Sequence, residues 1–144
     1  MVKLLIIYHS QSGNTEEMAR AVYEGALSAK ATVNLKKAAK VKDGDFLNCD
    51  AVILGSPNYF SYMAGAVKDF FDRTFYALRG KVNDKPYALF GSAGSGGTEA
   101  LDSLERLCTN LKLKKAAESV AAPGKASPEV LEECKELGRK LAQS

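Results

Sequence analysis

Apolar residues along the chain form short unbroken runs. These runs alternate with stretches in which apolar residues recur with the period of an α-helix. Three runs contain β-branched residues and end in polar loops, which is typical of strands buried on both faces. They cover residues 2–8, 50–56 and 86–91. Residues 32–36 and 116–121 are weaker strand candidates, the second because alanine has low strand propensity.

Four stretches have apolar residues three or four positions apart, which predicts amphipathic helices. They cover residues 15–29, 64–75 and 98–111 and a last segment that starts at Pro128. In the first stretch, Met18, Val22 and Ala26 share one face. Ser127 before Pro128 is typical of a helix start, because serine caps helices and proline suits the first helical position.

Strands that alternate with helices predict an α/β fold, here a three-layer doubly wound five-stranded parallel sheet. Right-handed crossovers leave few strand orders, and 2-1-3-4-5 is a common one. Residues 1–144 form a single domain, since no linker or repeat divides the chain. Ligands of such sheets bind beyond the carboxyl ends of the strands.

Composition limits the function classes. With 46% apolar and 26% charged residues, the chain is of the soluble globular type, and its longest apolar run is too short to cross a membrane. It lacks the features of a signal peptide, so we expect a cytoplasmic protein. The net charge is only +3, and its basic runs carry no interleaved aromatics, so no nucleic-acid platform is predicted.

The chain has three widely spaced cysteines, Cys49, Cys108 and Cys134. No Cys-x-x-Cys or Cys/His cluster is present, which argues against a zinc site and a disulfide framework. We therefore expect reduced thiols at buried or half-buried positions and no metal.

The loop after the first strand is rich in hydroxyl groups. It consists of Ser10, Gln11, Ser12, Gly13, Asn14 and Thr15. A helix start offers unpaired N–H groups, and a glycine lets the backbone curl around an anion, so the loop predicts a phosphate site built from neutral donors. The alternative is an ordinary turn in which Asn14 caps the helix.

This Ser-x-Ser-Gly-Asn-Thr pattern after an apolar strand is similar to the phosphate loop of the flavodoxins. The resemblance extends over essentially the whole chain. It implies a flavodoxin-like fold that binds FMN without covalent attachment, with the FMN phosphate in this loop.

The loop after the second strong strand is aromatic. Aromatic and apolar side chains there provide a stacking surface for a flat ring. Together with the following Met-Ala-Gly segment, the loop also resembles the flavin loop of flavodoxin-like quinone and FMN reductases. That resemblance implies that the flavin ring faces Pro57, Asn58, Tyr59, Phe60 and Tyr62.

The loop after the third strong strand consists of tiny residues, which allow a close approach of the backbone to a ligand. The corresponding loop of the family lines the other edge of the flavin. The residues implied are Ser92, Ala93, Gly94, Ser95, Gly96 and Gly97. Typical flavodoxins place an aromatic side chain in this loop. Because this chain has none, one flavin face is open or is covered by another subunit, so a homo-oligomer is one option.

Other proteins with related folds or motifs fit poorly. A receiver domain needs acidic residues at strand ends that here read Tyr8-His9-Ser10 and Gly55-Ser56. Residues 91–98 match a nucleotide-binding P-loop except that Gly97 stands at the required lysine. No Gly-x-Gly-x-x-Gly follows the first strand, and His9 has no evident catalytic partner.

Two functions fit a flavin protein without a catalytic set, because the cofactor itself carries out the redox chemistry. The first is an electron-transfer protein that cycles FMN between redox states and docks on redox partner proteins. The alternative is an NAD(P)H-dependent quinone or FMN reductase with a small quinone-like acceptor. The positive net charge counts against an ordinary carrier, but no feature marks an NAD(P)H site. A third option is a related scaffold that has lost its flavin.

Overall fold

The computed structural model describes residues 1–93 and 97–144. Helices and strands follow one another in the predicted order. The strands are β1 (Lys3–Tyr8), β2 (Thr32–Lys37), β3 (Ala51–Tyr59), β4 (Tyr62–Met63), β5 (Pro86–Ser92), β6 (Lys114–Lys115) and β7 (Val120–Ala122). The helices are α1 (Asn14–Ser28), the 3-10 turn η1 (Ala38–Lys40), α2 (Asp43–Leu47), α3 (Gly65–Leu78), α4 (Glu99–Asn110) and α5 (Pro128–Ala142).

The strands form one sheet of order β2-β1-β3-β5-β6, and all neighbours along this path are parallel. β7 also pairs in parallel with β5, so β6 and β7 share the fifth position. This arrangement confirms the predicted order 2-1-3-4-5. It corrects the fifth strand, which was expected over residues 116–121 but is split, because residues 116–119 leave the sheet. It also adds β4, a short antiparallel partner of β3.

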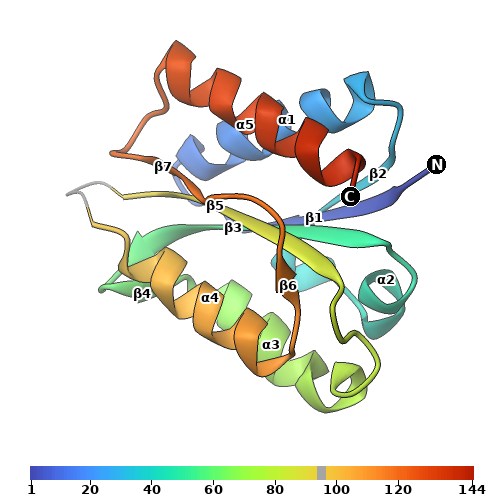
Figure 1. Cartoon of the computed structure of the whole chain (residues 1–144). Coiled ribbons are helices and arrows are strands. Elements are labelled where there is room, and N and C mark those ends of the chain that lie inside the picture. Colours follow the sequence, from blue (N-terminus) through green and yellow to red (C-terminus); the bar gives the residue numbers. More distant parts are fainter. Residues whose placement is uncertain (94–96) are drawn as a thin grey trace.

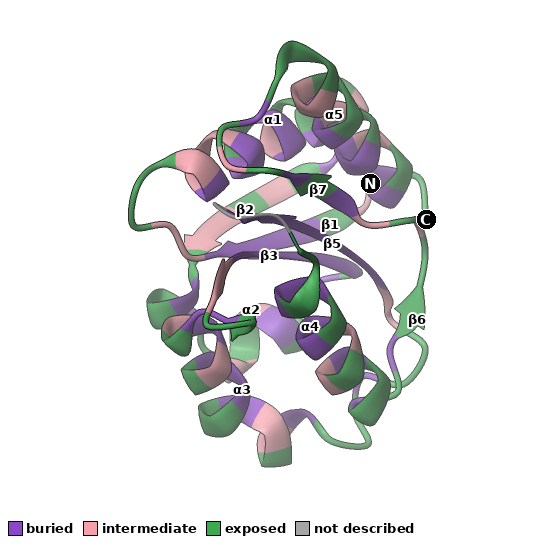
Figure 2. Ribbon diagram, turned by 90° about the vertical axis from the view of Figure 1, so that its left-hand side faces the viewer, coloured by how far each residue is buried: buried purple, intermediate pink, exposed green. Residues whose placement is uncertain are grey.

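Helices cover both faces of the sheet (Figure 1). α1 and α5 lie on one face, and α2, α3 and α4 lie on the other. Because successive strand residues point to opposite faces, Leu4 and Ile6 enter the core beneath α1 and α5, while Leu5 and Ile7 enter the other core. Figure 2 shows the central strands as a buried layer between the two helical layers. The predicted three-layer fold is confirmed.

α1 and α5 touch through two glycines. A Cβ atom at Gly25 would lie 1.9 Å from the carbonyl oxygen of Lys135, and one at Gly138 would lie 2.1 Å from that of Val22. Each glycine therefore lets the backbone of the opposite helix approach more closely than any side chain would allow. Through this contact α5 packs directly against α1, and the two helices together form one helical layer.

Two further expectations can be compared with the structure. Cys49, Cys108 and Cys134 are buried free thiols, as predicted, and burial raises the pKa of the Cys134 thiol to about 12. The helix expected over residues 64–75 continues to Leu78, whose side chain is fully buried and completes the apolar stripe. Among the described residues, no helix has both the length and the apolar character needed to cross a membrane.

Candidate functional site at the carboxyl edge of the sheet

The three chemically unusual loops meet at one edge of the sheet. In the parallel register, Tyr8 of β1 lies beside Gly55 of β3, and Pro57 of β3 lies beside Ser92 of β5. The segments that follow these strands therefore leave the sheet side by side, at the left of Figure 1 and toward the viewer in Figure 2. This is the edge at which ligands of doubly wound sheets bind.

The hydroxyl-rich loop ends in a left-handed glycine. Gly13 has φ 100° and ψ −11°, stands at the N-cap of α1, and makes no side-chain cap. The alternative in which Asn14 caps the helix is wrong, since Asn14 is the first helical residue. Gly13 donates its backbone N–H to Ser10 Oγ at 3.1 Å, which closes the loop on itself. The first N–H groups of α1 therefore stay available for an anion.

The remaining residues of this loop differ in exposure. Gln11 and Ser12 are exposed, whereas Thr15 is 1% exposed. Thr15 Oγ1 lies 2.7 Å from Ser92 Oγ, a buried hydrogen bond in which either hydroxyl can donate. The structure thus joins the first loop directly to the third.

The aromatic segment is a tight hairpin, which corrects its description as a loop. β3 continues through Pro57, Asn58 and Tyr59, and Tyr59 pairs with Tyr62 of β4. The two turn residues, Phe60 and Ser61, have φ values of 54° and 61°. Positive φ at both central residues is the geometry of a type I′ turn, which usually requires Asn and Gly. The hairpin is thus held in its shape by surrounding contacts.

Two serine hydroxyls provide such contacts. Ser56 Oγ accepts the backbone N–H of Ala64 at 2.8 Å, and Ser103 Oγ of α4 accepts that of Met63 at 3.1 Å. Both oxygens are buried. Sequence reasoning did not identify Ser103, because a serine on the buried stripe of a helix carries no local signal of a remote partner.

The aromatic side chains of the hairpin are exposed to different degrees. Phe60 is fully exposed, Tyr62 is partly exposed, and Tyr59 is half-buried with its ring edge-on to His9 at 6.1 Å between centroids. Partial burial raises the pKa of Tyr59. Tyr59 is therefore a neutral phenol at pH 7, which can donate a hydrogen bond and offers an apolar ring face.

The third segment is described on both sides of its tip. Ser92 and Ala93 are buried, and Ala93 donates its N–H to Ala122 O of β7 at 3.0 Å. Gly97 is exposed and has φ 102°. The predicted residues Gly94, Ser95 and Gly96 lie outside the described residues.

A side-chain contact joins the hairpin to the start of α4. Asn58 donates from Nδ2 to Glu99 Oε1 at 2.8 Å. Asn58 Oδ1 is buried and has no hydrogen-bond partner within residues 1–93 and 97–144. Glu99 was missed by sequence reasoning, since only the fold brings it near residue 58.

These groups match the chemistry of FMN. The open helix start, its loop hydroxyls and a left-handed glycine suit a phosphate. The hairpin offers aromatic faces, and the orphaned Asn58 Oδ1 suits a ring that carries an N–H donor. Among the described residues, no group of three His, Cys, Asp or Glu side chains could hold a metal ion.

Comparisons with known proteins agree with this geometry. The model of the flavodoxin family matches residues 6–138. A flavodoxin of Aquifex aeolicus is 33% identical over 160 residues, which cover 99% of this chain and 86% of that protein. An NAD(P)H dehydrogenase (quinone) 3 of Rhizobium meliloti is 32% identical over 124 residues, and the match covers 69% of this chain and 58% of that protein.

Solved structures show the same similarity. A flavodoxin from the domain Archaea has a TM-score of 0.87 at 27% identity, with 98% of this chain and 96% of that chain covered. The solution structure of two-electron reduced Megasphaera elsdenii flavodoxin has a TM-score of 0.84, also at 27% identity, with 98% and 99% covered. The chain belongs to the flavodoxin family of FMN-binding electron-transfer proteins.

Proposed function

We propose that the carboxyl edge of the sheet holds FMN, with the phosphate in the loop from Ser10 to Thr15. The left-handed backbone at Gly13 and the closure of the loop by Ser10 support this placement. Exposed Ser12 can offer its hydroxyl directly. Thr15 contributes by fixing the position of the loop, because its buried hydroxyl is hydrogen-bonded to Ser92.

The flavin ring lies between the hairpin and the third segment in this proposal. On the hairpin side the contacts come from Pro57, Asn58, Tyr59, Phe60 and Tyr62. On the opposite side they come from Ser92, Ala93 and Gly97, together with Gly94, Ser95 and Gly96. The small residues let the ring approach the backbone, and the exposed Phe60 would lose solvent contact against it.

Bound FMN supplies reversible electron storage, and the chain's own residues supply binding and orientation. The observation that carries the proposal is the Thr15–Ser92 hydrogen bond, which joins the phosphate loop to the ring segment. No side chain has to transfer a proton for this function.

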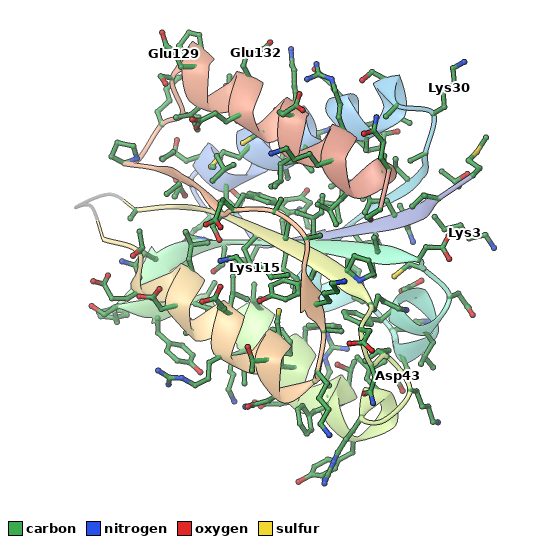
Figure 3. All side chains as sticks on the ribbon, in the orientation of Figure 1. Lys3, Lys30, Asp43, Lys115, Glu129 and Glu132 are labelled. Carbon is green, nitrogen blue, oxygen red and sulfur yellow. The ribbon has the colours of Figure 1, made fainter. Side chains whose placement is uncertain are left out.

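The surface charge around the site suggests a class of partner. Acidic residues fill the first turns of three helices that start at this edge: Glu16 and Glu17 in α1, Glu99 and Asp102 in α4, and Glu129 in α5. In Figure 3, Glu129 lies toward this edge, while Lys3, Lys30 and also the acidic Asp43 lie toward the opposite edge. The helix starts at this edge thus carry acidic side chains although the net charge of the chain is +3, and a redox protein with a basic docking face fits this edge.

A comparison of FMN with riboflavin tests the phosphate site. FMN is expected to bind at least about tenfold more tightly than riboflavin, as for a phosphate held by several hydrogen bonds. Ser12→Ala should narrow this difference, while Ser119→Ala, at a serine remote from the loop, should not. Affinities come from quenching of flavin fluorescence. Equal binding of FMN and riboflavin to the wild-type chain would place the phosphate elsewhere.

The similarity to quinone dehydrogenases supports a second candidate, reduction of a quinone by NAD(P)H. The chain spans 58% of the Rhizobium meliloti relative, so that protein has a substantial part without a counterpart here. Steady-state oxidation of NADH or NADPH with a quinone acceptor separates the two functions. Turnover at or above about 1 s⁻¹, the lower end of ordinary enzymes, would favour the reductase.

A further inference from the structure

Asn58 and Glu99 come from two elements that flank the proposed ring site, and their contact determines how the Asn58 amide is turned. The Asn58 Nδ2 atom lies 2.8 Å from Glu99 Oε1. An ionised carboxylate only accepts hydrogen bonds, so the amide nitrogen, which donates, must face it. The amide oxygen of Asn58 is therefore directed away from Glu99.

The position of Glu99 at the start of α4 keeps its side chain close to Asn58. It is the first residue of α4, where the positive end of the helix dipole favours a carboxylate. A Cβ atom at position 97 would lie 2.5 Å from Glu99 Oε1, so the glycine there leaves the space that the carboxylate occupies. The absence of a side chain at position 97 thus allows the contact between Glu99 and Asn58.

The amide oxygen that results from this orientation has no donor. Asn58 Oδ1 is buried and has no hydrogen-bond partner in the described part of the chain. Buried acceptors in proteins are nearly always satisfied. An unsatisfied acceptor at a binding site thus indicates that the ligand supplies the missing hydrogen-bond donor.

We infer that Glu99 is a positioning residue that fixes the Asn58 carboxamide so that Oδ1 accepts the imide N–H of the flavin ring. The inference rests on the proposed FMN site. The oxidised ring system carries one N–H, that of the imide, and its other polar ring atoms are acceptors. A carboxamide turned the other way would present a donor and could not bind this group.

The test follows the imide proton directly, by NMR of FMN labelled with ¹⁵N in the ring and bound to the full chain. In the wild-type protein this proton should exchange slowly with water. Asn58→Leu should speed its exchange by about tenfold, the order expected for a lost buried hydrogen bond. Glu99→Ala should speed it by a smaller factor. Glu99→Gln should restore slow exchange, because the glutamine oxygen still accepts from Nδ2.

Controls separate this role from general effects on the fold. Glu105→Ala removes another carboxylate of α4, one that pairs with Lys115 at 2.7 Å, and should leave the exchange unchanged. Asn58→Ala provides a second variant that lacks the amide if the leucine does not fit. Phosphorus NMR of the bound FMN reports whether the phosphate site is intact in each protein.

The outcomes are distinguishable. Exchange in Asn58→Leu and Asn58→Ala equal to that of the wild type would overturn the role of Asn58. Exchange in Glu99→Ala equal to that of the wild type would overturn the role of Glu99. If the wild-type chain binds no FMN at all, the proposed function itself fails. If the phosphate signal shows binding while the imide proton exchanges freely, only the present inference fails.

Discussion

Thr15 and Ser92 share a buried hydrogen bond of 2.7 Å, although 77 positions separate them in the chain. Thr15 belongs to the hydroxyl-rich loop at the start of α1, and Ser92 ends β5. Because β3 lies between β1 and β5 in the sheet, the bond spans the width of β3. It joins the two loops that we assign to the phosphate and to the ring. The two halves of the proposed FMN site are therefore joined by a hydrogen bond within the protein itself.

Loss of one hydroxyl of this pair should weaken the fold. Thr15→Val keeps the side-chain shape but leaves the Ser92 hydroxyl without a partner in a buried place, at an expected cost of about 1–2 kcal/mol in the free energy of unfolding. The FMN-free protein should show this in urea unfolding. The double variant Thr15→Val/Ser92→Ala should cost less than the sum of the two single changes, because it leaves no orphaned hydroxyl. Additive costs would show that the two hydroxyls do not interact.

Gly13 should resist substitution because of its backbone conformation. Nothing lies within 4 Å of a Cβ built there, but φ is 100°. Gly13→Ala should thus lower the unfolding free energy by about 1–2 kcal/mol and weaken FMN binding, although there is space for the methyl group. Gly65→Ala is the matched control, since that site is equally open and has no left-handed φ. An equal effect of both changes in chemical denaturation would contradict this explanation.

Close packing of α1 and α5 should make their two glycines sensitive to any side chain. Gly25→Ala and Gly138→Ala both place a methyl group on the backbone of the opposite helix, and each should cost about 3 kcal/mol of stability. Thermal unfolding followed by circular dichroism measures this loss. Gly44→Ala should be harmless, because its nearest neighbour, the side chain of Asn48, lies 3.8 Å away. A melting temperature unchanged by Gly25→Ala would contradict the view that the close contact of α1 and α5 stabilises the fold.

Asp45 should make stability depend on acidity. Burial alone would raise its pKa, but the N–H of Lys42 and the ammonium of Lys36, each at 2.9 Å, lower the pKa below its ordinary value of 3.8. The charged form is therefore stabilised in the folded protein, and this contribution is present above pH 3.8 and disappears as the pH falls through the lowered pKa.

Asp45→Asn measures this contribution. Because the pair is partly exposed, the substitution should cost only about 1 kcal/mol at pH 7. The difference between the wild type and the variant should shrink as the pH is lowered from 4 to 2, when urea unfolding is measured at each pH. A difference that stays constant over this range would show that the charge of Asp45 does not matter.

The sequence by itself determined the fold class and the edge of the sheet at which the three unusual loops lie. Short apolar runs such as residues 4–8 and 51–54, with β-branched residues and polar loops at their ends, are typical of buried strands, and the helical periods between them favour helices on both faces of a parallel sheet. Two local features could also be predicted from the sequence. The absence of a side chain at Gly13 predicted a tight curl of the backbone, which the structure shows as a left-handed residue, and Ser127 with Pro128 predicted the start of α5.

Only the tertiary structure decided which residues of the three loops meet. The Thr15–Ser92 bond, the contact of Asn58 with Glu99 and the closure of the hairpin by Ser103 join residues 40 or more positions apart. Such pairs leave no periodic trace in the sequence, because a hydroxyl or an amide is compatible with many environments until the chain folds. The hairpin turn at Phe60 and Ser61 shows the same limit. Its positive φ values run against the preference of both residues, and long-range contacts override that preference.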